Sequence, residues 1–274
     1  MNIQAITKIL TDAGIEETEA KREVSMLLEH FCGYTEIDKI RGKELSSEQI
    51  SLIAEKAELR ASDRIPIQYI IGEAWFMGEY FKVTPDVLIP RDETEILVRE
   101  AIRVIKENNF KEVLDIGTGS GCIACTVAKQ TNAVVLGVDI SSGALRVALD
   151  NVTKLGINNR AVFRKSDLYD KVREDEKFDL IISNPPYIPI GTELDVEVRH
   201  EPEIALFAED NGLSVYKRII EKAPKYLKKG GYVMLELGIN EAQSVKKFME
   251  KEFTDIYIIR DLAGIERVIA GRLR

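Results

Sequence analysis

Residues 184–187 read Asn-Pro-Pro-Tyr and follow an apolar run that begins at Phe178. Neither proline has a backbone N–H, so regular strand or helix pairing ends at this point. Pro185 also restricts Asn184 to extended conformations. The plainer interpretation is a rigid loop after a strand. The alternative is a stiff acceptor site that presents an amide side chain, unpaired carbonyl groups and an aromatic ring.

The chemistry suited to this segment is methyl transfer to a planar nitrogen. Such a nitrogen is a poor nucleophile because its lone pair is delocalised, as the amide rotation barrier of about 18–20 kcal/mol indicates. The Asn184 side-chain oxygen and the Pro185 carbonyl can each accept one N–H of the nitrogen. Both would stabilise the positive charge that grows on it, which is often the largest catalytic effect. The ring of Tyr187 can clamp the planar group, so the candidate catalytic residues are Asn184, Pro185, Pro186 and Tyr187.

A glycine-rich loop follows another apolar run, residues 113–116. Glycines let the backbone turn sharply and approach a ligand closely, and open α/β sheets bind ligands at the carboxyl ends of their strands. The spacing is G-x-G-x-G, whereas the dinucleotide fingerprint is G-x-G-x-x-G, and Cys122 stands at the place of its third glycine. No Gly-Lys-Ser/Thr follows, which excludes a P-loop. The candidate loop residues are Gly117, Thr118, Gly119, Ser120 and Gly121.

Acidic residues stand where the next two expected strands end. Asp139 lies about 20 residues after the loop, where a carboxylate can accept both ribose hydroxyls of an adenosine moiety. Asp167 could accept from the adenine amino group, and Leu168 could pack on the ring. Acids suit a cationic sulfonium and would repel a pyrophosphate. Together with Asn184, these residues predict a site for S-adenosylmethionine, whose product is S-adenosylhomocysteine.

Such a site needs strands that end at one common edge, and the pattern from residue 111 onward predicts them. The alternation of strands and helices indicates a doubly wound, seven-stranded, mostly parallel α/β sheet of the Rossmann-like type found in class I S-adenosylmethionine-dependent methyltransferases. The short connection at residues 262–266 predicts that the last two strands are antiparallel. Strands are expected at 112–116, 134–140, 161–165, 180–183, 232–237, 254–260 and 267–270. Helices are expected at 122–129, 143–155, weakly near 171–174, 213–228 and 240–251.

The rest of the chain divides into two further segments. Residues 1–72 show helical periodicity and predict a small substrate-recognition domain, with a helix capped at residues 46–49. Residues 73–90 are rich in aromatic and β-branched residues and predict a β-hairpin linker. A helix is expected at 93–106, and residues 91–274 form the predicted S-adenosylmethionine-binding methyltransferase domain.

Composition narrows the class of protein. The 274 residues carry a formal net charge of −8, and nothing indicates the basic face that nucleic-acid binders use. No apolar run reaches the roughly 18 residues of a membrane span, and the N-terminus does not resemble a secretion signal, so we expect a cytoplasmic protein without membrane contact. No cluster suits a resident metal. Cys122 and Cys125 form a C-x-x-C, which could be redox-active or half a zinc site, but small core side chains are favoured.

A glycine loop followed by Asn-Pro-Pro-Tyr resembles the amino-methyltransferases that act on planar nitrogens in DNA adenine, ribosomal RNA guanine or protein glutamine. Further segments resemble one family closely, the release factor glutamine methyltransferases, also called PrmC or HemK, and the likeness covers essentially the whole chain. These segments are residues 68–72, 83–91, 201–202, 205–206, 210–213, 235–238 with Gln243, and 261–264 before Arg267.

The resemblance implies a substrate and site roles. The family methylates the N5 amide nitrogen of the glutamine in the Gly-Gly-Gln loop of class I peptide chain release factors. It implies that residues 117–121 and Asp139 hold the cofactor, that residues 184–187 hold the glutamine amide, and that the N-terminal helices help to dock the release factor. The family usually reads Pro-Arg-Pro-Glu-Thr-Glu, whereas residues 90–95 read Pro-Arg-Asp-Glu-Thr-Glu. Asp92 suits a helix N-cap, so we expect a small effect.

Three alternatives remain open from the sequence. A sister enzyme that methylates a glutamine of a ribosomal protein would use the same chemistry. A DNA or ribosomal RNA amino-methyltransferase would need a basic groove and a base-recognition segment. A non-catalytic module that senses S-adenosylmethionine, or a ribosome-associated scaffold, would bind the cofactor without turnover, and the intact segment at residues 184–187 argues against it.

Overall fold

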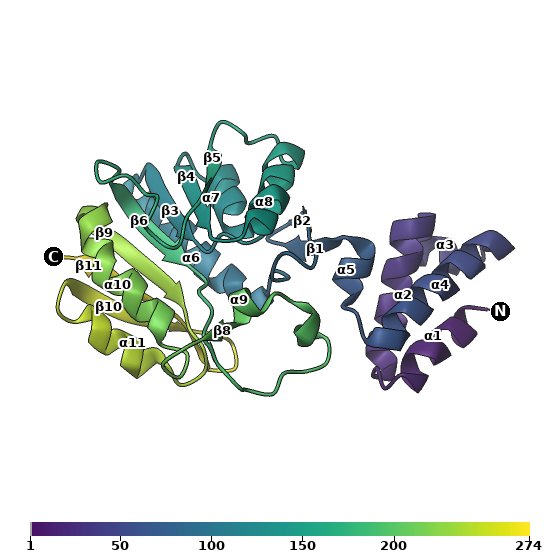
Figure 1. Cartoon of the computed structure of the whole chain (residues 1–274). Coiled ribbons are helices and arrows are strands. Elements are labelled where there is room, and N and C mark those ends of the chain that lie inside the picture. The colour runs from purple at the N-terminus through teal and green to yellow at the C-terminus, as the bar shows by residue number, and fades with distance from the viewer. Residues whose placement is uncertain (1) are drawn as a thin grey trace. The chain divides into compact units, whose positions relative to one another are not determined.

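A computed structural model of the chain describes residues 2–274; Met1, the first residue of the predicted helical domain, lies outside them. The chain forms two compact units. The smaller unit contains the chain up to Glu73 together with Leu194–His200, and the larger contains Ala74–Glu193 and Glu201–Arg274 (Figure 1). Nothing in the sequence pattern indicates that a segment from the second half of the chain packs with the N-terminal helices.

The smaller unit is helical, as predicted. Apolar residues at helical spacing turn inward, and Ile6, Leu10, Leu27 and Ile53 are fully buried in its core. The predicted cap is a capping box in which the Ser46 side chain accepts from the Gln49 backbone and the Gln49 side chain accepts in return. The helices are α1 Ile3–Asp12, α2 Glu17–Cys32, α3 Glu36–Ile40, α4 Ser47–Asp63 and α5 Ile67–Ile71.

A cluster of buried charged side chains holds residues 194–200 in the smaller unit. Arg60 on α4 donates to both carboxylate oxygens of Glu23 on α2, with Nε at 3.0 Å from Oε2, and both side chains are almost fully buried. Arg60 also donates to Glu197 at 3.2 Å, and Arg64 Nε donates to the same carboxylate at 2.7 Å. His200 contacts the Asp63 carbonyl at 2.6 Å. Residues 194–200 are therefore held by specific polar contacts.

The larger unit contains a seven-stranded sheet of order β10-β11-β9-β6-β3-β4-β5. The five strands from β9 to β5 in this order are parallel, and β11 pairs antiparallel with β9 and β10. The predicted fold class is therefore confirmed, including the antiparallel last pair. The strands are β3 Glu112–Ile116, β4 Val134–Asp139, β5 Ala161–Lys165, β6 Phe178–Ser183, β9 Leu227–Glu236, β10 Phe253–Arg260 and β11 Glu266–Leu273.

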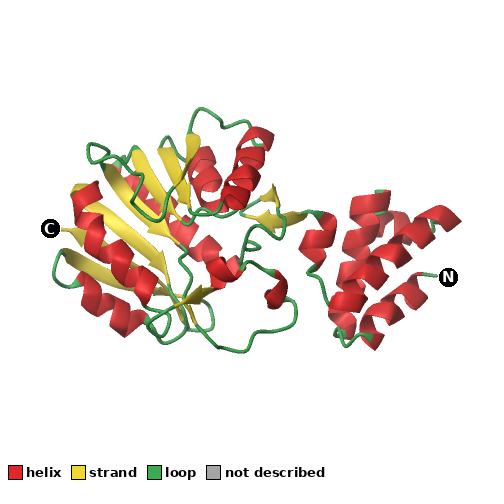
Figure 2. Cartoon of the chain, viewed as in Figure 1, coloured by secondary structure: helices red, strands yellow, loops and turns green. Residues whose placement is uncertain are grey.

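Helices cover both faces of the sheet (Figure 2). Successive strand residues alternate between two apolar cores, so that Val113 packs on one face and Leu114 on the other. One core contains α6 Asp92–Asn108, α7 Cys122–Gln130 and α8 Ser142–Lys154. The other contains α10 Ser214–Tyr226 and α11 Ala242–Met249. None of the helices in the described part of the chain is long and apolar enough to cross a membrane.

The predicted hairpin is present as β1 Glu73–Phe76 and β2 Glu79–Lys82. Phe76 and Phe81 bury their rings in the core of the larger unit. Asn151 on α8 accepts from the Lys82 N–H at 2.7 Å and donates to the Lys82 carbonyl at 3.0 Å. The hairpin is thus held against the rest of the larger unit by both packing and hydrogen bonds to its backbone.

Two local predictions are wrong. Residues near 171–174 form turns, because the Ser166 hydroxyl accepts from the Lys171 N–H and the Glu176 carboxylate accepts from the Arg173 N–H. Such side-chain bonds compete with a helix. Asp92 is the first helical residue rather than the N-cap, which is Arg91. Elements that no pattern predicted are β7 Ile188–Pro189, the 3-10 helix Val198–His200, α9 Glu203–Leu206 and β8 Phe207–Ala208.

We expect Arg60→Met to destabilise the helical unit by about 3–5 kcal/mol, because it leaves the buried Glu23 carboxylate without its partner. Urea unfolding followed by circular dichroism measures this. The double variant Glu23→Leu/Arg60→Met removes both charges and should recover most of the loss. Arg22→Met, at an exposed position of α2, should stay within about 0.5 kcal/mol of wild type. An Arg60→Met protein as stable as this control contradicts the stabilising role of the cluster.

Candidate active site

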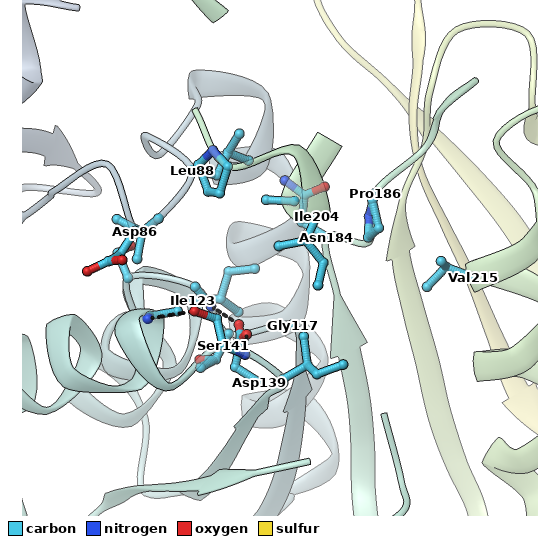
Figure 3. Close-up of a pocket in the computed structure, with 18 of the residues that line it drawn as sticks. Asp86, Leu88, Gly117, Ile123, Asp139, Ser141, Asn184, Pro186, Ile204 and Val215 are labelled. Carbon is cyan, nitrogen blue, oxygen red and sulfur yellow. Dashed lines mark hydrogen bonds between the residues drawn. The ribbon is translucent and has the colours of Figure 1, made fainter. Parts of the chain in front are cut away.

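A cavity of about 270 Å³ opens at the carboxyl ends of the parallel strands in the larger unit. The close-up shows Gly117, Asp139, Asn184 and Pro186 around it, although they come from different strand ends (Figure 3). It has the position expected of a ligand site in an open α/β sheet. Of the predicted site residues, those lining it are Gly117, Thr118, Gly119, Ser120, Asp139, Asp167, Leu168, Asn184 and Pro186.

The glycine loop needs backbone conformations that favour glycine. Gly117 and Gly119 have φ values of 71° and 54°, in the left-handed region. The N–H groups of Gly117 and Thr118 donate to the Val138 carbonyl at 2.9 and 3.0 Å, which fixes the loop on β4. Gly121 does not line the cavity; a Cβ there would stand 3.0 Å from the Cβ of Ala148, so this glycine permits close packing of α7 on α8.

Asp139 closes the loop against the end of β4. Its Oδ2 accepts from the Gly119 N–H at 2.9 Å and its Oδ1 accepts from the Ser141 N–H at 2.8 Å. Burial raises the pKa of Asp139, while these two backbone hydrogen bonds oppose the rise. The carboxylate is therefore held in one orientation at the cavity wall, where each oxygen retains a second lone pair for a ligand.

Asp167 and Leu168 lie on the wall formed after β5. Asp167 Oδ2 accepts from Arg218 of α10 at 2.8 Å, a pairing that the sequence does not reveal. Leu168 has a φ of 47°, which is uncommon for a branched residue. The Ser166 hydroxyl donates to the Leu168 carbonyl at 2.8 Å and supports this conformation. The strained backbone directs the leucine side chain to the cavity, in keeping with strain found at ligand sites.

Asn184 is brought to the cavity by the pairing of β6 with β3. Ile116 and Ser183 are partners in this parallel ladder, so the next residues of both strands lie side by side. The Asn184 carbonyl oxygen is 4.0 Å from the point where a Cβ would stand at Gly117. The Asn184 Nδ2 donates to the Thr94 hydroxyl oxygen at 3.1 Å. The amide oxygen of Asn184 therefore remains available as an acceptor.

Pro185 and Tyr187 are not among the residues that line the cavity. Pro185 is buried, and Tyr187 is half-buried against the second core. A Cβ at Gly238 would stand 3.0 Å from the Tyr187 ring, and a Cβ at Gly212 would collide with the Tyr187 carbonyl. Two glycines therefore permit the close fit of Tyr187. Burial raises its pKa well above the usual range, so the phenol stays protonated.

A second wall comes from residues 86–91 and 202–207, to which the sequence analysis assigns no role. Glu201 joins the two segments. Its buried carboxylate accepts from the Ile89 N–H at 3.1 Å and pairs with Arg91. In the sequence, only the family resemblance of residues 83–91 and 201–206 could have pointed to this wall. A resemblance alone does not show where these segments lie in the fold. Further lining residues not predicted are Leu88, Arg91, Thr94, Ser141, Ile204 and Arg218.

The cysteine pair lies in α7, where Cys125 is fully buried and Cys122 nearly so. Burial raises the pKa of Cys122 to about 12, which opposes thiolate chemistry. Within residues 2–274, no group of three or more histidine, cysteine or acidic side chains is placed to hold a metal ion. The polar groups of the residues that line the cavity are carboxylates, the Asn184 amide, hydroxyls, the Cys122 thiol, the guanidinium groups of Arg91 and Arg218, and backbone atoms.

Comparison with solved structures supports the fold. The chain is similar to a Thermus thermophilus 16S rRNA N2 G1207 methyltransferase (RsmC), with a TM-score of 0.55 at 19% identity, over 74% of this chain and 50% of that one. It is also similar to the hMettl16 catalytic domain, with a TM-score of 0.56 at 15% identity, over 79% and 81% of the two chains. The larger unit therefore has the Rossmann-like fold of these two proteins, with a cavity at the strand ends.

Sequence comparison narrows the class to a family. The Methyltransferase small domain matches residues 93–201, and the PrmC N-terminal domain matches residues 3–72. A release factor glutamine methyltransferase of Geobacter sulfurreducens is 40% identical, over 96% of this chain and 93% of that protein. One of Neisseria gonorrhoeae is 38% identical, over 92% and 93%. The chain belongs to the release factor glutamine methyltransferase family.

Asp115 lies directly before the glycine loop and provides a test of the site's electrostatics. Burial raises its pKa from 3.8 to about 7, and Asp139 adds to the rise, although the Thr118 hydroxyl donates to it at 2.6 Å. Between these two pH values the folded state binds a proton that the unfolded state does not. The contribution of Asp115 to the free energy of unfolding therefore falls as the pH rises from about 4 to about 7.

Asp115→Asn keeps the shape of the carboxyl but cannot ionise. We expect this variant to gain stability relative to wild type as the pH rises from about 4 to about 7, and the difference to level off above the folded pKa. Urea unfolding of both proteins across this range measures the difference. A difference independent of pH would show that Asp115 does not titrate in the folded protein near neutrality.

Proposed function

We propose that this chain transfers the methyl group of S-adenosylmethionine to the N5 amide nitrogen of the glutamine in the Gly-Gly-Gln motif of class I peptide chain release factors. One observation carries the proposal. Asn184 and the glycine loop border the same cavity, with the Asn184 carbonyl 4.0 Å from the Cβ position of Gly117. An acceptor held by Asn184 and a donor held by the loop would thus lie within reach of each other.

Features of the cavity support S-adenosylmethionine as the cofactor. The side-chain oxygen of Ser120 is buried with no hydrogen-bond partner among the described residues, so a ligand can supply one. Gly137 leaves room for the Thr118 side chain of the glycine loop, since a Cβ at residue 137 would stand 2.8 Å from the Thr118 hydroxyl oxygen. We assign acceptance of the ribose hydroxyls to Asp139, and contacts with the adenine to Asp167 and Leu168. We assign cofactor binding to residues 117–120, Asp139, Asp167, Leu168 and the backbone of Asn184, whereas Gly121 permits the close packing of α7 on α8.

The bound cofactor supplies an electrophilic methyl group on a positively charged sulfur. Asn184 Oδ1 and the Pro185 carbonyl accept the two N–H groups of the glutamine amide and direct its lone pair toward that methyl group. Alignment of this kind contributes up to roughly 7–11 kcal/mol in ideal cases. The same two acceptors stabilise the positive charge on nitrogen. The nitrogen becomes acidic as it gains charge, so its proton can pass to water without a dedicated base. Pro186 stiffens the turn, and Tyr187 limits access of water.

The relatives support the choice of substrate. Three relatives named release factor glutamine methyltransferases align with this chain over more than 90% of their own length. The helical unit matches the PrmC N-terminal domain, and we assign release-factor docking to it. Release factors act in the cytoplasm, where we place this chain. The likeness to RNA-modifying enzymes is below 25% identity and concerns the fold.

Purified chain, labelled S-adenosylmethionine and a class I release factor test the substrate. We expect label on the release factor and none on a release factor whose motif glutamine is replaced by asparagine. Ribosomal proteins, DNA and ribosomal RNA serve as competing substrates in parallel reactions. Label on a ribosomal protein or on nucleic acid, with none on the release factor, would falsify the proposal in favour of the corresponding alternative.

Asn184→Ala should lower turnover on the order of 10²-fold or more, by analogy with the loss of one oxyanion donor. Cofactor affinity should change little, since the backbone of residue 184 remains. Initial rates and calorimetry measure the two quantities. Asn159→Ala, at an exposed position, should keep wild-type turnover. Near wild-type turnover in Asn184→Ala would remove the amide clamp from the mechanism.

Asp139→Ala should act on the other half of the site. We expect a clear loss of S-adenosylmethionine affinity in calorimetry, because the variant lacks the carboxylate that faces the ribose and orders the loop. Saturating cofactor should restore much of the turnover. Unchanged affinity in a folded Asp139→Ala protein would argue against this carboxylate as a ligand.

A further inference from the structure

Two buried polar side chains stand behind Asn184 and have no role in the mechanism given above. Thr94, on the first turn of α6, is 3% exposed and accepts the hydrogen bond from Asn184 Nδ2 at 3.1 Å. Glu236, at the end of β9, is 2% exposed. Ser183 and Leu235 are partners in the β6–β9 ladder. The next residues, Asn184 and Glu236, therefore lie side by side.

The orientation of the Asn184 amide decides whether the acceptor site works. An asparagine side chain has a donating NH₂ and an accepting oxygen on opposite sides. Only the orientation with NH₂ toward Thr94 leaves the oxygen for a substrate N–H. The Thr94 hydroxyl cannot select this orientation alone, because a hydroxyl can accept or donate. A third group must fix the direction of its hydrogen.

Glu236 can supply this constraint. The Thr94 hydroxyl lies close enough to the Glu236 carboxyl to lower the pKa of that carboxyl. An ionised carboxylate only accepts, so it takes the hydrogen of the Thr94 hydroxyl. The hydroxyl oxygen must then accept, and the Asn184 amide must donate to it. A protonated Glu236 can donate to the Thr94 oxygen instead. The Thr94 hydroxyl is then free to donate to Asn184, and the Asn184 side-chain amide can flip.

We propose that Thr94 and Glu236 are positioning residues that hold the Asn184 amide with its oxygen toward the acceptor. This role rests on the proposed transfer to a glutamine amide and adds residues that set how efficiently that transfer occurs. In the proposed network Asn184 donates to Thr94, as the structure shows, and Thr94 in turn donates to Glu236. Neither Thr94 nor Glu236 touches the reacting atoms.

The surroundings of Glu236 place its ionisation near neutral pH. Burial raises its pKa to about 7, and the Thr94 hydroxyl lowers it by a smaller amount. Its Oε2 has no hydrogen-bond partner among the described residues, so the ion is weakly compensated. The charged and titratable groups that face it are Glu93 and Arg91 at the start of α6, Arg267 on β11, Tyr187 after β6 and Cys122 on α7.

The direction of the pH effect follows. Below about pH 7 Glu236 is protonated and the orientation of Asn184 is not fixed. As the pH rises through this value the carboxylate forms, the amide is locked, and turnover increases. The cofactor site is formed by other residues, so the KM for S-adenosylmethionine should change less than kcat.

The first variants address Thr94. Thr94→Val keeps the side-chain shape and removes the hydroxyl; we expect kcat to fall about tenfold, the effect of one lost hydrogen bond. Thr94→Ser keeps the hydroxyl and should restore most of the turnover. Thr126→Val, at another buried threonine whose hydroxyl has no partner among the described residues, is the control and should behave as wild type. Equal turnover in Thr94→Val and wild type, or no recovery in Thr94→Ser, overturns the role of the hydroxyl.

The pH dependence addresses Glu236. Wild type should show a kcat that rises with a midpoint near pH 7, and Glu236→Gln should show a lower kcat without this rise. Glu100→Gln, on the same helix as Thr94 but hydrogen-bonded to Arg103 and Tyr257, should retain the wild-type profile. A Glu236→Gln protein with an unchanged rise assigns the titration to another group and overturns the proposal.

A spectroscopic measurement separates this proposal from the proposed function. The side-chain NH₂ signals of Asn184 in ¹⁵N-labelled protein, assigned by their loss in Asn184→Asp, need no substrate. They should shift with pH around 7 in wild type and stay constant in Glu236→Gln. If the wild-type protein shows this titration but does not methylate the release factor, the positioning network stands and the proposed substrate is wrong. Signals that do not titrate in wild type overturn the network, whatever the substrate.

Discussion

The parallel pairing of β3 with β6 is the constraint on which the whole site depends. Its register joins Ile116 to Ser183, so the glycine loop and the Asn-Pro-Pro-Tyr segment begin at the same edge of the sheet. A slip of one residue would turn the side chains of β6 to the opposite face. The apolar cores on both faces oppose such a slip, because Ile181 and Ile182 are fully buried on different sides.

The electrostatics of the cavity follow from the same arrangement. Strand ends bring Asp115 and Asp139 together, and burial raises the pKa of both. Arg218 neutralises Asp167 at the wall, at 2.8 Å. A cation in this cavity would lower the pKa of each nearby carboxyl and so bind more tightly as they ionise. A positively charged sulfonium is therefore compatible with the site.

Periodicity predicted the sheet well because strand and helix patterns are local and the core enforces them. The strands at 112–116 and 161–165 are found with the predicted bounds. Residues 188–208 could not be predicted, since their short elements are fixed by distant partners. Glu197 is held by Arg60 and Arg64, and Glu201 by Ile89 and Arg91. Pairings across more than a hundred residues leave no periodic signal.

The candidate site shows the same division. The loop glycines, Asp139 and Asn184 could be found because each follows a recognisable strand. Thr94, Arg218 and Glu236 could not, because a lone polar residue on a helix or strand is usually solvent-exposed, and only the fold turns these three toward the site. Tyr187 belongs to the same sequence segment as Asn184, but its ring packs near Gly238. Direction of a side chain in a loop is set by tertiary contacts.

A crystal structure of the chain with S-adenosylhomocysteine and a Gly-Gly-Gln peptide tests the central claim most directly. The account predicts that the glutamine amide nitrogen lies roughly 2.7–3.2 Å from both Asn184 Oδ1 and the Pro185 carbonyl oxygen, on the side that faces the cofactor sulfur. A glutamine whose amide nitrogen contacts neither oxygen, or points away from the sulfur, would contradict it.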